Sequence, residues 1–413
     1  MIDLKKLREN PDFFRKATAD KQRDPNLVDE VLALDEEKRA WQQKVETLRA
    51  ERNKLGKENL ERGKALKIEL EKLEDELKVL EGKLISTLWG IPNPALPNVP
   101  TGKGESGNVE VRKWGKIPKF DFPVKSHFEL GESLDVIDTP RAGKVSGTRF
   151  GYLKNEGVLM ELALVNMGMK FLVEKGFTPI IPPVLIKKEV MTALGYNNYG
   201  FEETYIIPED NLCLVATAEH AIVPYYKDET LKEEDLPRRF VGFSSAFRRE
   251  AGSYGKDTKG ILRVHQFNKL EMISLVKPED SEKEHQFMLS LEEELMQQLK
   301  LSYRVVQMCT GDLGDPAAAK YDIDAWFPSE GKFRETHSTS NCTDYQARRL
   351  NIRFRRKTGE PEFVHILNGT VFSERPILAI LENYQQPDGS VVIPEVLRDY
   401  VGKDKISPKA DRF

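Results

Sequence analysis

The chain has 413 residues, of which 31% are charged and 39% hydrophobic, and its formal net charge is −4. A chain of this length can form two or three domains. Because its net charge is slightly negative, the chain as a whole is not a basic nucleic-acid-binding protein, and any contact with nucleic acid must come from local basic patches. No run of about 18 apolar residues occurs, so no membrane span is expected. The scattered cysteines and the absence of a signal-peptide apolar block favour a cytoplasmic protein.

A heptad pattern runs through the first hundred residues. Apolar side chains recur every seven residues in two runs, and the first contains Leu27, Leu34, Trp41, Leu48 and Leu55, the second Leu66, Leu70, Leu73, Leu77, Leu80 and Leu84. Gly63 lies between the runs and is interpreted as a helix stop. Residues 1–100 are therefore predicted to form a domain with a long antiparallel α-helical coiled-coil hairpin, each arm spanning roughly 45 Å.

Basic residues gather near the predicted tip of this hairpin. Seven basic and three acidic residues lie between Arg49 and Lys67. The candidates for contacts with nucleic-acid phosphates are Arg49, Arg52, Lys54, Lys57, Arg62 and Lys64. The alternative is an ordinary solvated coiled-coil surface, in which mixed charges are common.

A second domain is predicted for residues 101–413, after a linker rich in proline and glycine at residues 91–108. The predicted helices are 157–174, 281–300 and 377–383, and the predicted strands include 302–308, 352–356 and 363–367. Because strands and helices mix without regular βαβ alternation, the domain is predicted to be α+β around an antiparallel sheet.

The most informative segment runs from Phe247 to Glu271. Alternating apolar residues predict strands over 241–247 and 261–273, and Gly252, Gly255 and Gly260 predict a loop between them. The arginines of this segment suit phosphate or carboxylate groups, because their rigid fork binds such groups bidentately.

This hairpin resembles motif 2 of class II aminoacyl-tRNA synthetases. Its sequences REAGSYGKDT and RVHQF resemble those of seryl-tRNA synthetases in particular. Residues 170–184 resemble motif 1 of the class, and residues 363–385 resemble motif 3. The segment TAE at residues 217–219 resembles the serine-binding loop of the family, and ETHSTSNC at residues 335–342 resembles the segment that holds ATP and magnesium.

The resemblance implies that serine is activated by ATP, with Mg²⁺, and transferred to tRNA-Ser. It implies catalytic roles for Arg248, Glu271 and Arg375. Besides Arg248 and Glu271, the implied serine-binding residues are Thr217, Ala218, Glu219, Asn341 and Thr370. The implied ATP-binding residues are Arg248, Arg249, Glu250, Arg263, Val264, Phe267, Glu335, Thr336, His337, Ser338 and Arg375, of which Glu335 and Ser338 would hold the metal.

The resemblance also implies a homodimer whose coiled coil binds the long variable arm of tRNA-Ser, with selenocysteine tRNA left open as a further substrate. The chain departs from the family at Ala216, at His220, at residues 336–339 (THST) and in the segment TVFSER at residues 370–375, where the family has small residues. Two other functions stay open, the first of them because of the departure at residues 370–375. One is a non-catalytic RNA-binding protein, and the other is a ligase that charges a carrier protein, although such ligases lack the long hairpin.

Overall fold

The computed structural model describes residues 1–55, 59–196, 201–252, 259–357 and 359–408. The chain divides into two compact units, Met1–Pro94 and Ala95–Phe413. The division falls inside the linker that separates the two predicted domains. In the described part of the chain, no helix has the length and apolarity needed to cross a membrane.

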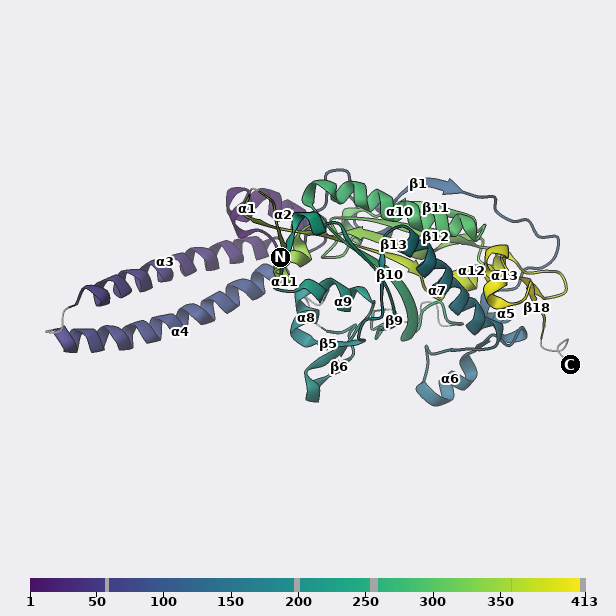
Figure 1. Ribbon diagram of the computed structural model, residues 1–413, viewed down its shortest axis with the longest axis horizontal. Helices are drawn as coiled ribbons and strands as arrows, with labels where there is room; N and C mark the ends of the chain where they lie inside the picture. The colour runs from purple at the N-terminus through teal and green to yellow at the C-terminus, as the bar shows by residue number, and fades with distance from the viewer. Residues whose placement is uncertain (56–58, 197–200, 253–258, 358, 409–413) are drawn as a thin grey trace. The chain divides into compact units, whose positions relative to one another are not determined.

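The first unit contains the predicted helical hairpin. Its helices are α1 (Leu4–Glu9), α2 (Pro11–Asp20), α3 (Asn26–Lys54) and α4 (Leu60–Gly90), and Figure 1 shows α3 and α4 running side by side. Between them, Val45, Leu70 and Leu73 are buried with Trp41, Leu48 and Leu77 packed around them. These are heptad positions, so the coiled-coil prediction is confirmed.

The prediction that Gly63 ends a helix is wrong. The first arm ends at Lys54 and α4 begins at Leu60, so Gly63 lies within the first turn of α4. A glycine inside a helix costs about 1 kcal/mol relative to alanine. The buried leucines further along α4 stabilise the helix against this cost, because helical stability in proteins comes mainly from packing of the apolar face.

The second unit is built on an eight-stranded sheet of order β1-β11-β12-β13-β16-β10-β9-β4. All neighbouring strands are antiparallel except β4 and β9, which are parallel. The predicted α+β fold with an antiparallel sheet is confirmed. In this sheet the strands are β1 (Val109–Trp114), β4 (Thr178–Ile180), β9 (Arg238–Phe247), β10 (Gln266–Val276), β11 (Tyr303–Gln307), β12 (Ala319–Phe327), β13 (Lys332–Asn341) and β16 (His365–Phe372).

Smaller sheets and short helices complete the unit. The remaining strands are β2 (Ile137–Asp138), β3 (Tyr152–Leu153), β5 (Leu185–Lys187), β6 (Ile206–Ile207), β7 (Leu212–Leu214), β8 (Thr230–Lys232), β14 (Arg353–Arg355), β15 (Pro361–Phe363), β17 (Val391–Val392) and β18 (Lys405–Ile406). The short helices are α5 (His127–Ser133), α6 (Thr139–Ser146), α8 (Lys188–Ala193), α9 (Glu219–Ile222), α11 (Tyr345–Leu350) and α13 (Glu395–Val401).

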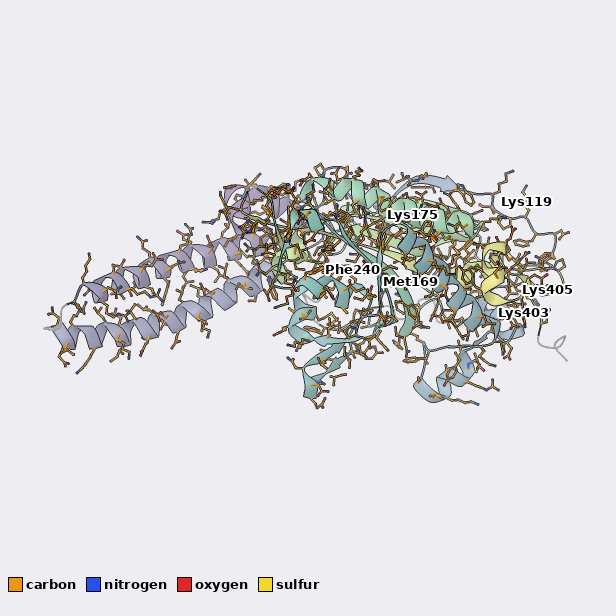
Figure 2. The ribbon with its side chains drawn as sticks, in the orientation of Figure 1. Lys119, Met169, Lys175, Phe240, Lys403 and Lys405 are labelled. Carbon is orange, nitrogen blue, oxygen red and sulfur yellow. The ribbon has the colours of Figure 1, made fainter. Side chains whose placement is uncertain are left out.

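Three longer helices supply most of the apolar core with the sheet. They are α7 (Glu156–Glu174), α10 (Ser281–Gln298) and α12 (Arg375–Asn383), and all three pack against strands of the large sheet (Figure 1). Their apolar side chains are buried in one cluster with residues of the central strands. All three were predicted as helices. Figure 2 shows how densely side chains fill this unit around the labelled Met169 of α7 and Phe240 of β9.

Two predicted strands need correction. The strand predicted for 261–273 begins only at Gln266, because the backbone N–H of His265 donates to the carbonyl of Arg149 rather than to a ladder partner, while Ile261 and Leu262 are buried in the core. The strand predicted for 363–367 is divided, since β15 ends at Phe363 and β16 begins at His365. The central strands β12 and β13 were not predicted.

Candidate active site

The site lies on β9, β10 and β16, where Glu271 is the cross-strand neighbour of Gly242 and of Thr370. Helix α9 packs against the same place, and Gly242 makes this possible. A Cβ atom on Gly242 would lie 2.2 Å from the Cδ1 atom of Ile222 in α9. The glycine therefore lets the segment at residues 217–219, which leads into α9, approach Glu271.

Glu271 is a buried carboxylate, with 1% of its surface exposed. It forms an ion pair with Lys269, two residues earlier on the same strand, and accepts a hydrogen bond from Thr217. Burial raises the pKa of Glu271, while Lys269 and Arg248 oppose the rise. The nearby cations thus favour the charged form of this acid.

Glu219, the first residue of α9, is also buried. The hydroxyl of Tyr196 donates to its Oε1 atom at 2.8 Å and lies 3.0 Å from its Oε2 atom. The Nε2 atom of Gln346 in α11 donates to Oε1 at 2.9 Å. Burial raises the pKa of Glu219 to about 7, against the effect of these hydrogen bonds and of Lys269, and with a smaller contribution from the charge of Glu271.

Two buried carboxylates with a threonine hydroxyl beside them form a suitable site for a substrate ammonium group. Opposite charge close to a carboxylate favours its ionised form. An arriving ammonium would therefore lower the pKa of both acids and gain binding energy from both. This is the arrangement predicted for Thr217, Glu219 and Glu271.

Two predicted arginines converge next to these acids. The guanidinium of Arg248, which follows β9, lies over the ring of Phe267 at 5.1 Å from the centroid, and its Nε and Nη2 atoms lie 3.4 Å from the carbonyl oxygen of Ala216. Arg375, at the start of α12, is close enough that its charge lowers the pKa of Arg248, after burial has lowered it more. The site therefore holds concentrated positive charge, which favours a polyphosphate.

Arg375 is fixed by Glu335 of β13. Its Nη1 atom donates to the backbone carbonyl of Glu335 at 3.0 Å and lies 3.1 Å from the carboxylate oxygen. Burial would raise the pKa of Glu335, but Arg375, Lys320 and Arg248 outweigh it and the pKa falls to about 2. Glu335 is therefore a permanent anion between cations.

The other motif 2 residues lie near the turn that follows β9. Glu250 accepts from the Nη1 atom of Arg263 at 2.7 Å and has a left-handed backbone with φ of 52°. Arg249 donates its backbone N–H to the carbonyl of Glu203. Val264 is buried in the main core, where Phe267 also packs. Residues 253–258 of the predicted loop, including Gly255, lie outside the described residues.

Three predicted residues of the segment at 335–342 make contacts inside the protein. Thr336 donates its hydroxyl to the carbonyl of Ile323 at 3.1 Å, and His337 is buried with its ring in edge contact with Phe372. Burial lowers the pKa of His337 to about 4. Asn341 is fully buried, and its Oδ1 atom accepts the backbone N–H of Thr343 at 2.9 Å. The roles of these three residues toward ATP and serine stay predictions.

Glu335 and Ser338 offer the hard oxygen ligands that Mg²⁺ prefers. Ser338 is the cross-strand neighbour of Asp322, whose carboxylate lies 3.2 Å from the Nζ atom of Lys320. Among the described residues, no group of three or more His, Cys, Asp or Glu could hold a metal alone. This donor set fits Mg²⁺ bound jointly by the protein and by substrate phosphates, and not a metal held by the protein alone.

The bulky residues of the segment at 370–375 do not crowd the acids. Val371 and Phe372 are buried in the core, where a Cβ atom on Gly168 of α7 would lie 2.9 Å from Val371 and 3.0 Å from Phe372. Thr370 is the residue paired with Glu271. The departure from the family pattern is therefore accommodated in the helix layer beneath the strands.

The predicted tRNA-binding residues belong to the first unit. Arg49 pairs with Glu74 at 2.9 Å, Arg62 with Glu51 at 2.7 Å, and Lys64 with Glu61 at 3.0 Å. Arg52 and Lys54 are exposed, and neither forms an ion pair among the described residues. Lys57 lies outside the described residues.

Sequence reasoning did not single out Tyr196, Gln346 or Lys269. Tyr196 lies in no motif, and Gln346 lies just after the segment at residues 335–342. Their contacts with Glu219 join positions 23 and 127 residues apart, which no local pattern reveals. Lys269 had a signal, since it lies two residues before Glu271 on a strand where alternate residues share a face.

The comparisons with known proteins agree with this geometry. Residues 199–384 match the family model described as "tRNA synthetase class II core domain (G, H, P, S and T)", and residues 1–95 match "Seryl-tRNA synthetase N-terminal domain". The chain is 46% identical to a serine–tRNA ligase of Dictyoglomus turgidum, over 99% of this chain and 100% of that protein. It is 47% identical to that of Thermobifida fusca, over 100% of both chains.

A solved structure shows the same fold. The seryl-tRNA synthetase from Pyrococcus horikoshii, complexed with ATP, is 42% identical, with a TM-score of 0.94 over 99% of this chain and 100% of that chain. Likeness at this identity and coverage extends to both units of the chain. The chain therefore belongs to the seryl-tRNA synthetase family, within the class II aminoacyl-tRNA synthetases.

Proposed function

We propose that this chain activates L-serine with ATP and transfers the seryl group to tRNA-Ser. The observation that carries the proposal is the buried carboxylate pair Glu219 and Glu271 next to the converging arginines Arg248 and Arg375. The acids suit the serine ammonium, and the arginines suit the triphosphate. An amino acid and ATP would therefore be held side by side.

In the first step the serine carboxylate attacks the α-phosphorus of ATP, and the bond to the leaving pyrophosphate breaks. Arg248 would contact the serine carboxylate and the α-phosphate, and Arg375 the γ-phosphate. Preorganised charge of this kind is worth about 3 kcal/mol per group in other enzymes. The adenine would stack on Phe267, whose ring already carries the Arg248 guanidinium, while Glu250 reads its amino group. No covalent nucleophile of the protein is needed, because orientation supplies much of the acceleration.

Mg²⁺ would be held by Glu335 and Ser338 together with phosphate oxygens. Bound there, it would neutralise phosphate charge. The role of the chain is to keep Glu335 ionised, and Arg375, Lys320 and Arg248 do this.

The partners of the proposed enzyme follow from its family. The helical hairpin α3–α4 would bind tRNA-Ser, and the active form would be a homodimer in the cytoplasm. The exposed apolar side chains Leu159, Leu162 and Val173 of α7 support a partner at α7, whose last residues belong to the segment that resembles motif 1. The mass of the purified protein in solution, measured by light scattering, tests the dimer.

The decisive experiment is ATP–pyrophosphate exchange with serine, threonine, alanine or no amino acid. We expect exchange with serine, and a loss of about 10²–10³-fold in Arg248→Ala, because one donor to developing charge is removed. Arg112→Ala is the control, since Arg112 forms a surface ion pair with Glu293. A folded protein that binds tRNA without serine-dependent exchange would contradict the proposal and favour a non-catalytic RNA-binding protein.

A further inference from the structure

We propose that Tyr196 is a positioning residue of the serine site, which holds the Glu219 carboxylate in place for the substrate ammonium group. This inference rests on the proposed serine activation. Tyr196 lies in none of the family motifs, and it reaches the site from the segment that follows α8. Tyr196 is 43% exposed as a whole residue, whereas Glu219 is only 3% exposed. The hydroxyl therefore reaches inward from the surface to a buried acid.

The carboxylate of Glu219 is held by two elements. Tyr196 contacts both carboxylate oxygens, at 2.8 and 3.0 Å, and Gln346 of α11 donates to Oε1 at 2.9 Å. Gln346 is fully buried, so its position is set by packing. With hydrogen bonds from two sides, the carboxylate has one defined orientation before any substrate binds.

The backbone at Tyr196 is itself fixed against α11. Gly195 has φ of +89°, a conformation that favours glycine. A Cβ atom there would lie 2.6 Å from the Nη1 atom of Arg349 and 2.8 Å from the Cε1 atom of Tyr345, both in α11. The backbone at Gly195 therefore packs closely against α11, the helix that carries Gln346. This contact fixes the position of the Tyr196 backbone.

The Tyr196 ring also rests on a neutral partner. It lies 5.0 Å from the ring of His220, with an angle of 36° between the planes. The backbone N–H of Ala216 donates to Nδ1 of His220 at 3.3 Å, and burial lowers the pKa of His220 to about 3. His220 is therefore uncharged at neutral pH, and adds no cation to compete with the substrate ammonium for Glu219.

The hydrogen bond from Tyr196 should also affect how far Glu219 is ionised, and this can be measured. The titratable and charged groups that act on Glu219 or on its neighbours Tyr196 and His220 are Glu271 and Lys269 from β10, His220 and Tyr196 themselves, Arg248 beyond β9, and Cys342 just before α11. From α11, Arg349 and Tyr345 lie beside Gly195. Burial raises the pKa of Glu219 to about 7, and the hydrogen bonds from Gln346 and Tyr196 lower it. Without the Tyr196 hydroxyl the pKa would rise further, and less of the acid would be ionised at pH 7 to bind an ammonium.

The test is Tyr196→Phe in the full-length protein, measured by ATP–pyrophosphate exchange between pH 6.5 and pH 9. We expect the KM for serine at pH 7 to rise about tenfold, because the variant removes a hydrogen bond to a charged group. The KM for ATP should stay unchanged. The difference in KM for serine between variant and wild type should decrease toward pH 9, because Glu219 is then ionised even without the hydrogen bond from Tyr196. Tyr225→Phe is the matched control, because Tyr225 is 56% exposed and keeps its ring contacts with Tyr226 and Phe240.

Calorimetry provides a second readout that does not depend on turnover. Serine binding at pH 7, measured in two buffers of different ionisation enthalpy, should release more protons from Tyr196→Phe than from the wild type, because more Glu219 starts protonated.

Three results would overturn the inference. They are an unchanged KM for serine, a lower KM, which would mean that the hydroxyl competes with the ammonium, and an equal loss for serine and ATP at every pH, which would mean a structural role. The wild-type protein would still exchange in each case, so the proposed function would stand.

Discussion

At the scale of single residues, the structure explains how Glu374 can lie next to Arg375, the arginine predicted to be catalytic. The carboxylate of Glu374 accepts the backbone N–H of Asn268 at 3.3 Å, and the Nδ2 atom of Asn268 donates to Glu161 of α7 at 2.9 Å. Burial first, and then the charge of Glu161, raise the pKa of Glu374 to about 8. Glu374 is thus mostly protonated at neutral pH, and it does not compete with Glu335 for Arg375.

Replacing Glu374 with glutamine should stabilise the protein at high pH. The folded pKa of about 8 lies above the ordinary value of 4.5, so the contribution of Glu374 to stability is full below pH 4.5 and is lost as the pH rises through 8. Glu374→Gln keeps the acceptor for Asn268 but cannot ionise. We expect little change in free energy of unfolding at pH 5 and a gain of about 1–3 kcal/mol at pH 9.

Thermal unfolding midpoints at both pH values provide the measurement. Glu209→Gln is the control, because Glu209 is exposed. If the midpoint of Glu374→Gln differed from that of the wild type by the same amount at pH 5 and pH 9, the carboxyl of Glu374 would not titrate in the native protein as argued.

At the scale of elements, hydrophobic periodicity predicted the helices that bury one apolar face. The heptads predicted α3 and α4, and apolar runs predicted α7, α10 and α12. Periodicity did not predict β12 and β13, where charged and polar residues such as Asp322, Asp324 and Ser338 lie on central strands. Asp322 and Asp324 are buried beside cations. Asp322 pairs with Lys320 on the same strand, and Asp324 pairs with Arg304 of the neighbouring strand β11.

The same limit applies to the proposed serine site. Glu219 and Glu271 could be predicted because each lies in a motif, and the structure confirms that they lie near one another. Tyr196 and Gln346 could not, since their contact with Glu219 arises from folding of segments far apart in the chain.

A substitution between the two long helices can destabilise the hairpin without changing the catalytic unit. Leu70 is 1% exposed between the two long helices, whereas Ile68 on the same helix is 70% exposed. Leu70→Ala should destabilise the hairpin by about 2–5 kcal/mol, because the substitution leaves a cavity, and Ile68→Ala should change little. Serine-dependent exchange should survive in both variants, whereas tRNA charging should fall in Leu70→Ala. Equal charging by the two variants would show that an intact hairpin is not needed for tRNA binding.

At the scale of the whole molecule, a net charge of −4 must be reconciled with a polyanionic partner. Long-range attraction to tRNA cannot come from the total charge, so it must come from local cations. Among the basic residues near the tip, Arg49, Arg62 and Lys64 are paired with glutamates. Arg52 and Lys54 are exposed and form no ion pair within the described residues. Since they have no carboxylate partner there, their charge is the most available to phosphates.

The double variant Arg52→Ala/Lys54→Ala tests this argument through salt dependence. Removing one cation that binds a phosphate should lower the slope of log affinity against log salt by about 1, so the double variant should lower it by about 2. Affinity for tRNA-Ser at low salt should fall as well, and serine-dependent exchange without tRNA should stay unchanged. Lys44→Ala/Lys78→Ala removes the same charge from exposed positions further along the two helices, so it separates binding at the tip from general attraction. If both double variants lowered the slope equally, tRNA would respond to the total charge of the hairpin, and the tip would have no special role.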